Sequence, residues 1–157
     1  MTKLTIARIV ATFGGFGYLP LAPGTWGSLA AAIVYLVIGS FFSTQASFTY
    51  IIIFLAALTY FSGVWSVKKV QKEWGSDPSK VVIDEACGIF VTMLPVAFSW
   101  TNAAIGFVLF RIFDIWKPLG IRKIDQIKSE GGHSVMLDDV AAGIYAAVVL
   151  GCINAFL

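Results

Sequence analysis

Five long apolar stretches separated by short polar segments dominate the chain. They lie at about residues 26–42, 47–67, 86–98, 103–116 and 140–157. A helix needs about 20 residues to cross the hydrocarbon core of a bilayer. The first, second and last stretches are long enough to do so with some tilt, whereas the other two are short. We therefore expect an all-α integral membrane bundle of about five helices, in which the two short stretches form either full spans or a re-entrant hairpin.

The charged residues define the orientation of this bundle. They fall into three zones, residues 3–8, 68–85 and 111–139, while the connections near 43–46 and 99–102 carry no charge. If the five segments cross alternately, all three charged zones lie on one side of the membrane. Lys and Arg dominate that side, and the positive-inside rule assigns it to the cytoplasm. We expect a cytoplasmic N-terminus and an uncharged C-terminus on the opposite side.

The composition supports the membrane assignment and excludes other classes. The 157 residues are 58% hydrophobic and only 13% charged, whereas a soluble domain has about 25% charged residues. No linker or repeat divides the chain, so we expect a single domain over residues 1–157. A net charge of +2 without a basic run gives no indication of nucleic-acid binding. Cys87 and Cys152 lie in apolar runs, which is typical of packing residues.

Acidic residues gather at the predicted cytoplasmic ends of three apolar stretches. These residues are Asp84, Glu85, Asp114, Asp138 and Asp139. One reading is that they cap helix N-termini, where acids oppose the helix dipole. Capping does not explain two adjacent acids at two separate sites, or Asp114 near a helix C-terminus. A shared divalent cation explains both features, and a set of oxygen ligands without a His/Cys cluster suits Mg²⁺ rather than zinc.

Basic residues accompany these acids. Arg111, Asp114 and Lys117 are spaced three residues apart and share one helix face. Arg is suited to bidentate contacts with phosphate, and Lys acts as a point charge. An internal ion pair with Asp114 is an alternative that is compatible with phosphate binding. The single histidine, His133, lies in a polar loop, where it is either a plain loop residue or a proton shuttle.

Small residues open the first apolar stretch. Gly24, Thr25, Gly27 and Ser28 stand where the predicted helix begins. Small side chains allow backbone N–H groups at a helix N-terminus to approach a phosphate. A purely structural turn is the alternative. The stretch is not a P-loop, because no Gly-Lys-Ser/Thr sequence follows.

Four sequence blocks carry a resemblance to a known family. The blocks "LAPGTWGSL", "VVIDEACG", "FRIFDIWKP" and "GGHSVMLDDVAAG" occur in this order. Together they resemble the phosphatidylglycerophosphatase A family of bacterial membrane lipid phosphatases, over about residues 14 to 146. Leu119 and Gly120 replace the Trp-Pro of many relatives, and Ser134 replaces a Gly.

The resemblance implies a Mg²⁺-dependent hydrolase of the bacterial inner membrane, with its active site facing the cytoplasm. It implies hydrolysis of the terminal phosphate of phosphatidylglycerophosphate, a phospholipid substrate, to give phosphatidylglycerol. The expected catalytic and metal-binding residues are Asp84, Glu85, Asp138 and Asp139, with Asp114 as a further metal ligand. The candidate phosphate-binding residues are Arg111, Lys117, Lys80, Gly24, Thr25, Gly27 and Ser28. One carboxylate acts either as a general base or as the nucleophile that attacks phosphorus.

The main alternative is a small non-enzymatic transporter or channel component with an acidic cytoplasmic cation site. Such proteins place polar residues near the middle of membrane helices. Here the acids gather at the ends of the apolar stretches. A CDP-alcohol phosphotransferase also gathers aspartates at a membrane face, but its spaced aspartate signature is absent. The sequence leaves the oligomeric state and the number of metal ions open.

Overall fold

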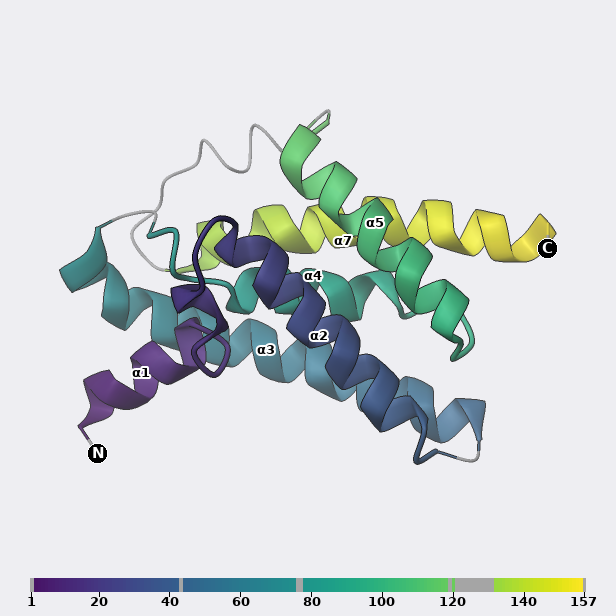
Figure 1. Cartoon of the computed structure of the whole chain (residues 1–157), viewed down its shortest axis with the longest axis horizontal. Helices are drawn as coiled ribbons and strands as arrows, with labels where there is room; N and C mark the ends of the chain where they lie inside the picture. Colours follow the sequence, from purple (N-terminus) through teal and green to yellow (C-terminus); the bar gives the residue numbers. More distant parts are fainter. Residues whose placement is uncertain (1, 43, 76–77, 119, 121–131, 157) are drawn as a thin grey trace.

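The structure is a computed structural model that describes residues 2–42, 44–75, 78–118, 120 and 132–156 (Figure 1). The described residues form six α-helices and one 3₁₀-helix, and they contain no strand. The elements are α1 (Lys3–Ala11), η1 (Phe16–Tyr18), α2 (Pro23–Gly39), α3 (Gln45–Trp74), α4 (Ile83–Thr92), α5 (Trp100–Trp116) and α7 (His133–Phe156). The predicted all-α class is confirmed.

Helix α1 is an addition to the five expected segments. Thr2 caps it by accepting a hydrogen bond from the backbone N–H of Thr5. Its small residues Ala7 and Ala11 are fully buried, and α1 packs against α3. A helix of 9 residues with only part of its surface apolar is too short to stand out in a search for membrane spans.

Two of the described helices, α3 and α7, are long and apolar enough to cross a membrane. They contain 30 and 24 residues, respectively. Helix α4 contains only 10 residues, which corresponds to a length of about 15 Å, half of a bilayer core of about 30 Å. It begins before the apolar stretch predicted at 86–98 and ends at Thr92, three residues before Pro95.

Helix α4 is the centre of the bundle. Figure 1 shows it between α3 and α7, with α2 and α5 crossing on the near side, and it contacts all four of these helices. Eight of its residues are buried, including Ile89 and Phe90 on different sides of the helix. A helix that is buried all round needs apolar residues on every face, which explains the apolar run that follows its two acids. The two acids at its start are therefore placed inside the bundle.

Two glycines bring α4 and α7 into backbone contact. A Cβ atom on Gly143 would lie 2.6 Å from the carbonyl oxygen of Gly88, and a Cβ atom on Gly88 would lie 2.9 Å from that of Asp139. Neither site has space for a side chain. The Thr92 hydroxyl donates to the Gly88 carbonyl at 2.8 Å within the same contact. This close approach holds the first turn of α4 beside Asp139.

A pair of asparagines joins α5 and α7 at the far end of the bundle. The Asn102 side-chain amide donates to Asn154 Oδ1 at 3.1 Å, and the Asn154 amide donates to Asn102 Oδ1 at 2.9 Å. Hydrogen bonds between membrane helices contribute about 0.6–2 kcal/mol each. The pair fixes the position of α5 along α7, and so the position of Arg111 relative to the acids of α7.

Candidate active site

Three carboxylates, two of them on buried residues and one on the half-buried Glu85, converge where α4 meets α7. Asp84 and Glu85 occupy the first turn of α4, and Asp139 lies in the second turn of α7. One oxygen atom of each lies within 4.8 Å of the others. Only 9% of Asp84 and 4% of Asp139 is exposed. We call Asp84, Glu85 and Asp139 the acid triad. Three carboxylates this close repel one another unless protons or a cation reduce their charge.

Two oxygen atoms of the acid triad lack a hydrogen-bond partner among the described residues. They are Asp84 Oδ1 and Glu85 Oε2, and both are inaccessible to solvent. A buried oxygen without a partner costs about 1–3 kcal/mol, and more if it is charged. These atoms are therefore available as ligands for a metal ion.

Burial also shifts the pKa values of the two carboxylic acids in the first turn of α4, Asp84 and Glu85. The pKa of Asp84 is raised to about 6 as the net effect of several causes: burial raises it most, a hydrogen bond with Glu85 lowers it, and the charges of Asp138 and Asp114 raise it. Burial raises the pKa of Glu85 as well, and the adjacent Asp84 carboxylate adds to this increase. Without a cation, these side chains retain protons to a higher pH than exposed acids. A divalent cation at the acid triad would displace those protons.

The other two predicted metal ligands form ion pairs beside the acid triad. Asp114 pairs with Arg111 at 2.5 Å, and Asp138 pairs with Lys117 at 2.7 Å. Lys117 ends α5 in the left-handed conformation, with φ 45°. The geometry thus brings together three of the five acids as a candidate cation site. Asp114 and Asp138 orient the two basic side chains next to it.

The N-terminus of α2 forms another wall of the site. A Cβ atom on Gly24 would lie 2.1 Å from Glu85 Oε1 and 3.3 Å from Arg111 Nη1. The same guanidinium nitrogen donates to the Ser28 hydroxyl at 3.4 Å, and Ser28 donates to the Gly24 carbonyl at 2.7 Å. Only glycine fits between Glu85 and Arg111. Gly24 and Ser28 therefore lie beside the acid triad, and their contacts with phosphate remain predictions.

Thr25 and Gly27 belong to the same helix start but make different contacts. The backbone N–H of Thr25 donates to the Ala22 carbonyl, and its side chain is half-buried. A Cβ atom on Gly27 would lie 2.6 Å from Val82 Cβ. Gly27 therefore allows α2 to pack closely against the start of α4. Their proposed contacts with phosphate remain predictions.

Lys80 and His133 contact aromatic residues. The Lys80 ammonium lies 5.8 Å from the ring centroids of both Tyr18 and Trp74, a cation–π arrangement. His133 Nδ1 lies 3.1 Å from the Tyr60 hydroxyl. The phosphate contact of Lys80 therefore remains a prediction.

Two positions after Lys117 differ from many members of the family. Leu119 lies outside the described residues, and Gly120 has φ 90°, a conformation that favours glycine.

Sequence reasoning missed the contacts that position the site. These are the Gly88–Gly143 approach between α4 and α7 and the Asn102–Asn154 pair between α5 and α7. Small residues and amides in apolar helices are typical of helix–helix contacts. That signal indicates that a contact exists, but it does not say which helices meet.

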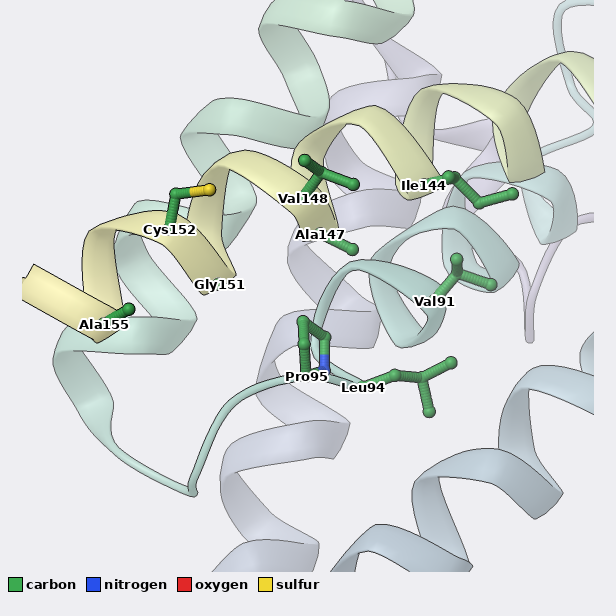
Figure 2. Close-up of a pocket in the computed structure, with 9 residues that line it drawn as sticks. All are labelled: Val91, Leu94, Pro95, Ile144, Ala147, Val148, Gly151, Cys152 and Ala155. Carbon is green, nitrogen blue, oxygen red and sulfur yellow. The ribbon is translucent and has the colours of Figure 1, made fainter.

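An apolar groove lies beyond this contact, where α4 ends against α7 (Figure 2). Its volume is about 580 Å³. The lining residues are Val91, Leu94, Pro95, Ile144, Ala147, Val148, Gly151, Cys152 and Ala155. None of them carries a charge. The groove is therefore separate from the acid triad and has no group that performs phosphate chemistry.

Buried carboxylates beside an arginine and a lysine, within a bundle of apolar helices, are typical of an enzyme that acts on the phosphate of a membrane lipid. The sequence model of the family "Phosphatidylglycerophosphatase A" matches residues 9–154. The chain belongs to the phosphatidylglycerophosphatase A family and is a phosphatase. This confirms the resemblance carried by the four sequence blocks and favours the enzyme over the transporter.

Similar curated proteins include two that carry the name of this family and one with a different name. A protein from Bacteroides thetaiotaomicron, provisionally named a phosphatidylinositol-3-phosphatase, is 40% identical over 146 residues, 90% of this chain and 89% of the relative. Phosphatidylglycerophosphatase A of Haemophilus influenzae is 35% identical, covering 98% of this chain and 92% of the relative. The Escherichia coli protein of the same name is 35% identical, covering 91% and 80%, respectively. No solved structure shows a significant match.

Proposed function

We propose that this protein is a Mg²⁺-dependent phosphatidylglycerophosphatase of the bacterial inner membrane. It hydrolyses the terminal phosphate monoester of phosphatidylglycerophosphate and leaves phosphatidylglycerol. The observation that carries the proposal is the convergence of three carboxylates, two of them on buried residues, within 4.8 Å of one another, beside the Arg111 guanidinium. The names of the Haemophilus influenzae and Escherichia coli relatives support this substrate.

The acid triad fits a magnesium ion. Mg²⁺ prefers carboxylate oxygens and retains several water ligands. Asp84, Glu85 and Asp139 supply such oxygens, and two of them have no other partner among the described residues. When bound, the ion would offset charge on the phosphate and lower the pKa of a bound water.

The side chains around the acid triad would bind and orient the phosphate. Arg111 and Lys117 are held toward the site by Asp114 and Asp138, which reduces the entropy lost when they bind phosphoryl oxygens. Gly24 allows the start of α2 to approach Arg111 closely.

A carboxylate of the acid triad either accepts the proton of an attacking water or attacks phosphorus itself. Hydroxylamine added during turnover separates the two routes, with mass spectrometry of the protein as the readout. Direct attack forms an acyl phosphate, which hydroxylamine converts to a hydroxamate of that carboxylate with release of phosphate, whereas water attack forms no covalent intermediate and leaves the carboxylates unmodified.

The proposed topology places the N-terminus and the acid triad on the cytoplasmic side. The distribution of Lys and Arg and the two candidate spans support this orientation. Helix α4 alone is too short to cross. However, Asn102 of α5 pairs with Asn154, close to the end of α7. The segment of α4 and α5 therefore extends as deep as α7, which favours a full hairpin over a re-entrant one.

The test is phosphate release by the detergent-purified protein. Phosphatidylglycerophosphate, phosphatidylinositol 3-phosphate and phosphatidic acid would be supplied separately, each with Mg²⁺ and with a chelator. We expect Mg²⁺-dependent release from phosphatidylglycerophosphate and none from the inactive Asp84→Asn control. Release that is unchanged by the chelator would contradict the metal proposal.

The same assay tests a second candidate substrate. The name of the Bacteroides thetaiotaomicron relative favours phosphatidylinositol 3-phosphate, which also carries a phosphate monoester on a lipid headgroup. Faster release from this lipid than from phosphatidylglycerophosphate would reassign the substrate and leave the site chemistry unchanged.

A further inference from the structure

The outer face of α3 changes from apolar to basic along its length. The residues that share this face are Phe54, Leu58, Phe61, Trp65, Lys68, Lys69 and Lys72. Their spacing of three or four residues places them on one side of the helix. The four apolar side chains are between 42% and 69% exposed. The buried residues of α3, such as Ile52, Ala56, Gly63 and Val67, lie on the opposite side.

The face therefore passes from exposed apolar residues, through one tryptophan, to three lysines. Tryptophan is enriched where a bilayer meets water, and lysine follows it on the cytoplasmic side. We call Trp65, Lys68, Lys69 and Lys72 the lysine face. Lys68 and Lys72 are exposed, and Lys69 is half-buried.

The lysine side chains lean toward the apolar half of α3. In a helix, side chains point back toward the N-terminus. Lys69 shows this direction, because its ammonium lies 5.4 Å from the ring centroid of Trp65, one turn earlier. The ammonium groups are thus directed toward the level where headgroups meet acyl chains.

The lysine face lies closer to the predicted cytoplasmic side than the acid triad does. A Cβ atom on Gly63 would lie 2.5 Å from Met136 Sδ, so Gly63 and Met136 are level with each other. Trp65 is two residues from Gly63, and Asp139 is three residues from Met136 on an antiparallel helix. At 1.5 Å per residue, the offset from Asp139 along the helices is about 8 Å for Trp65 and about 12–18 Å for Lys68 to Lys72.

No described carboxylate neutralises these lysines through an ion pair. The only acid in α3 is Glu73, and it pairs with Arg8 of α1. The other ion pairs among the described residues involve Arg111 and Lys117. The lysine face therefore presents a net positive charge beside an apolar surface.

We propose that the lysine face binds the anionic headgroups of phospholipids in the cytoplasmic leaflet, at a site distinct from the catalytic one. This inference shares the proposed membrane orientation but not the proposed reaction. Charge complementarity and the continuous apolar stripe identify the ligand as a lipid headgroup attached to acyl chains. The site enriches anionic lipids around the enzyme and anchors the cytoplasmic end of α3 at headgroup depth.

The test is lipid binding by delipidated Asp84→Asn protein, measured by native mass spectrometry. Phosphatidylserine serves as the probe because it is anionic and carries no phosphate monoester, and phosphatidylcholine serves as the neutral comparison. Removal of one lysine near an anionic surface weakens binding about fivefold. We therefore expect about a hundredfold weaker phosphatidylserine binding in Lys68→Gln/Lys69→Gln/Lys72→Gln, with no change for phosphatidylcholine.

Two controls separate charge from structure. The triple arginine variant at these positions keeps the charge and retains binding, and Lys3→Gln, at an exposed position of α1, has no effect. The three single Gln variants each show about fivefold weaker binding, which keeps the test decisive if the triple variant does not fold.

Two results would overturn the proposal: equal binding of both lipids by the parent protein, or parental phosphatidylserine binding by the triple Gln variant. The rate of phosphate release from a short-chain substrate in micelles gives a separate check. When the three Gln substitutions are made in protein with wild-type Asp84, we expect this rate to stay within twofold of that of the wild type. Loss of this activity would indicate that the lysine face and the catalytic site are not separate. A negative result in the lipid-binding experiment alone would leave the catalytic proposal unaffected.

Discussion

The contact between α4 and α7 has two ends of opposite character. Near Asp84 and Asp139 it is buried and acidic, whereas near Pro95 and Gly151 it is apolar and open (Figure 2). The Gly88–Gly143 approach lies between them. The acidic end needs fixed geometry, because three carboxylates must face one cation. The apolar end has no such requirement. The same pair of helices therefore combines a rigid site with a surface that tolerates substitution.

The largest contrast is expected from isosteric substitutions at the two ends of α7. Asp139→Asn removes one carboxylate of the acid triad, and Cys152→Ser changes a residue of the groove. A metal-bound site contributes several kcal/mol to transition-state stabilisation. We expect Asp139→Asn to reduce kcat/KM at least about a hundredfold, and Cys152→Ser to change it less than twofold. Similar losses in phosphate release would contradict the separation of the two ends.

Two alanine substitutions test the close helix contact. In Gly143→Ala the new Cβ atom meets the Gly88 carbonyl at 2.6 Å, whereas in Gly151→Ala the nearest atom, Pro95 Cβ, is 3.7 Å away. Overpacking costs about 1–3 kcal/mol, which lowers Tm by about 3–10 °C. We expect Gly143→Ala to lose stability and about tenfold of its activity, while Gly151→Ala stays within about 1 °C of wild type. Equal melting curves in the two variants would show that the helices tolerate separation.

The acid triad should also make stability depend on pH and Mg²⁺. Because burial raises the pKa of Asp84 to about 6, the folded protein without metal binds more protons than the unfolded chain. Its stability therefore falls as pH rises from about 4 through 6. Mg²⁺ binds the deprotonated acids and should raise Tm more at pH 8 than at pH 5. Thermal melts with Mg²⁺ and with a chelator measure this, and Asp84→Asn should show a smaller effect of both pH and Mg²⁺.

The smallest effect is expected from modification of the two cysteines. Cys152 is exposed, whereas Cys87 is buried in the bundle with 1% of its surface accessible. N-ethylmaleimide should label Cys152 in the folded protein and reach Cys87 only after unfolding. Mass spectrometry locates the label, and activity should change less than twofold. Labelling of Cys87 in the folded protein would mean that the interior around α4 opens.

The apolar stretches allowed the fold class to be predicted, and the charge distribution indicated the main part of the candidate site. An acid in an apolar stretch is costly, so Asp84, Glu85 and Asp139 carried a clear signal, and they converge in the structure. Asp114 and Asp138 carried the same signal but form ion pairs with Arg111 and Lys117. Sequence could not separate the two groups, because the ion pairs depend on where α5 ends and how it sits along α7.

The helix contacts were less predictable for a related reason. Hydropathy measures composition over a window, so it did not reveal that α4 ends at Thr92 after 10 residues. A glycine within a helix is compatible with many neighbours, and nothing local identifies Gly143 as the partner of Gly88. Pairing is a property of two segments together, and a single sequence reports each segment separately.

The central claim is that the acid triad holds a divalent cation, and Mn²⁺ binding tests it most directly. Electron paramagnetic resonance of free Mn²⁺ would be recorded during titration of the wild-type protein, Asp84→Asn and Cys152→Ser. We expect saturable binding that Mg²⁺ displaces in the wild type and in Cys152→Ser, and its loss in Asp84→Asn. Equal binding in all three proteins, or none in the wild type, would contradict the account.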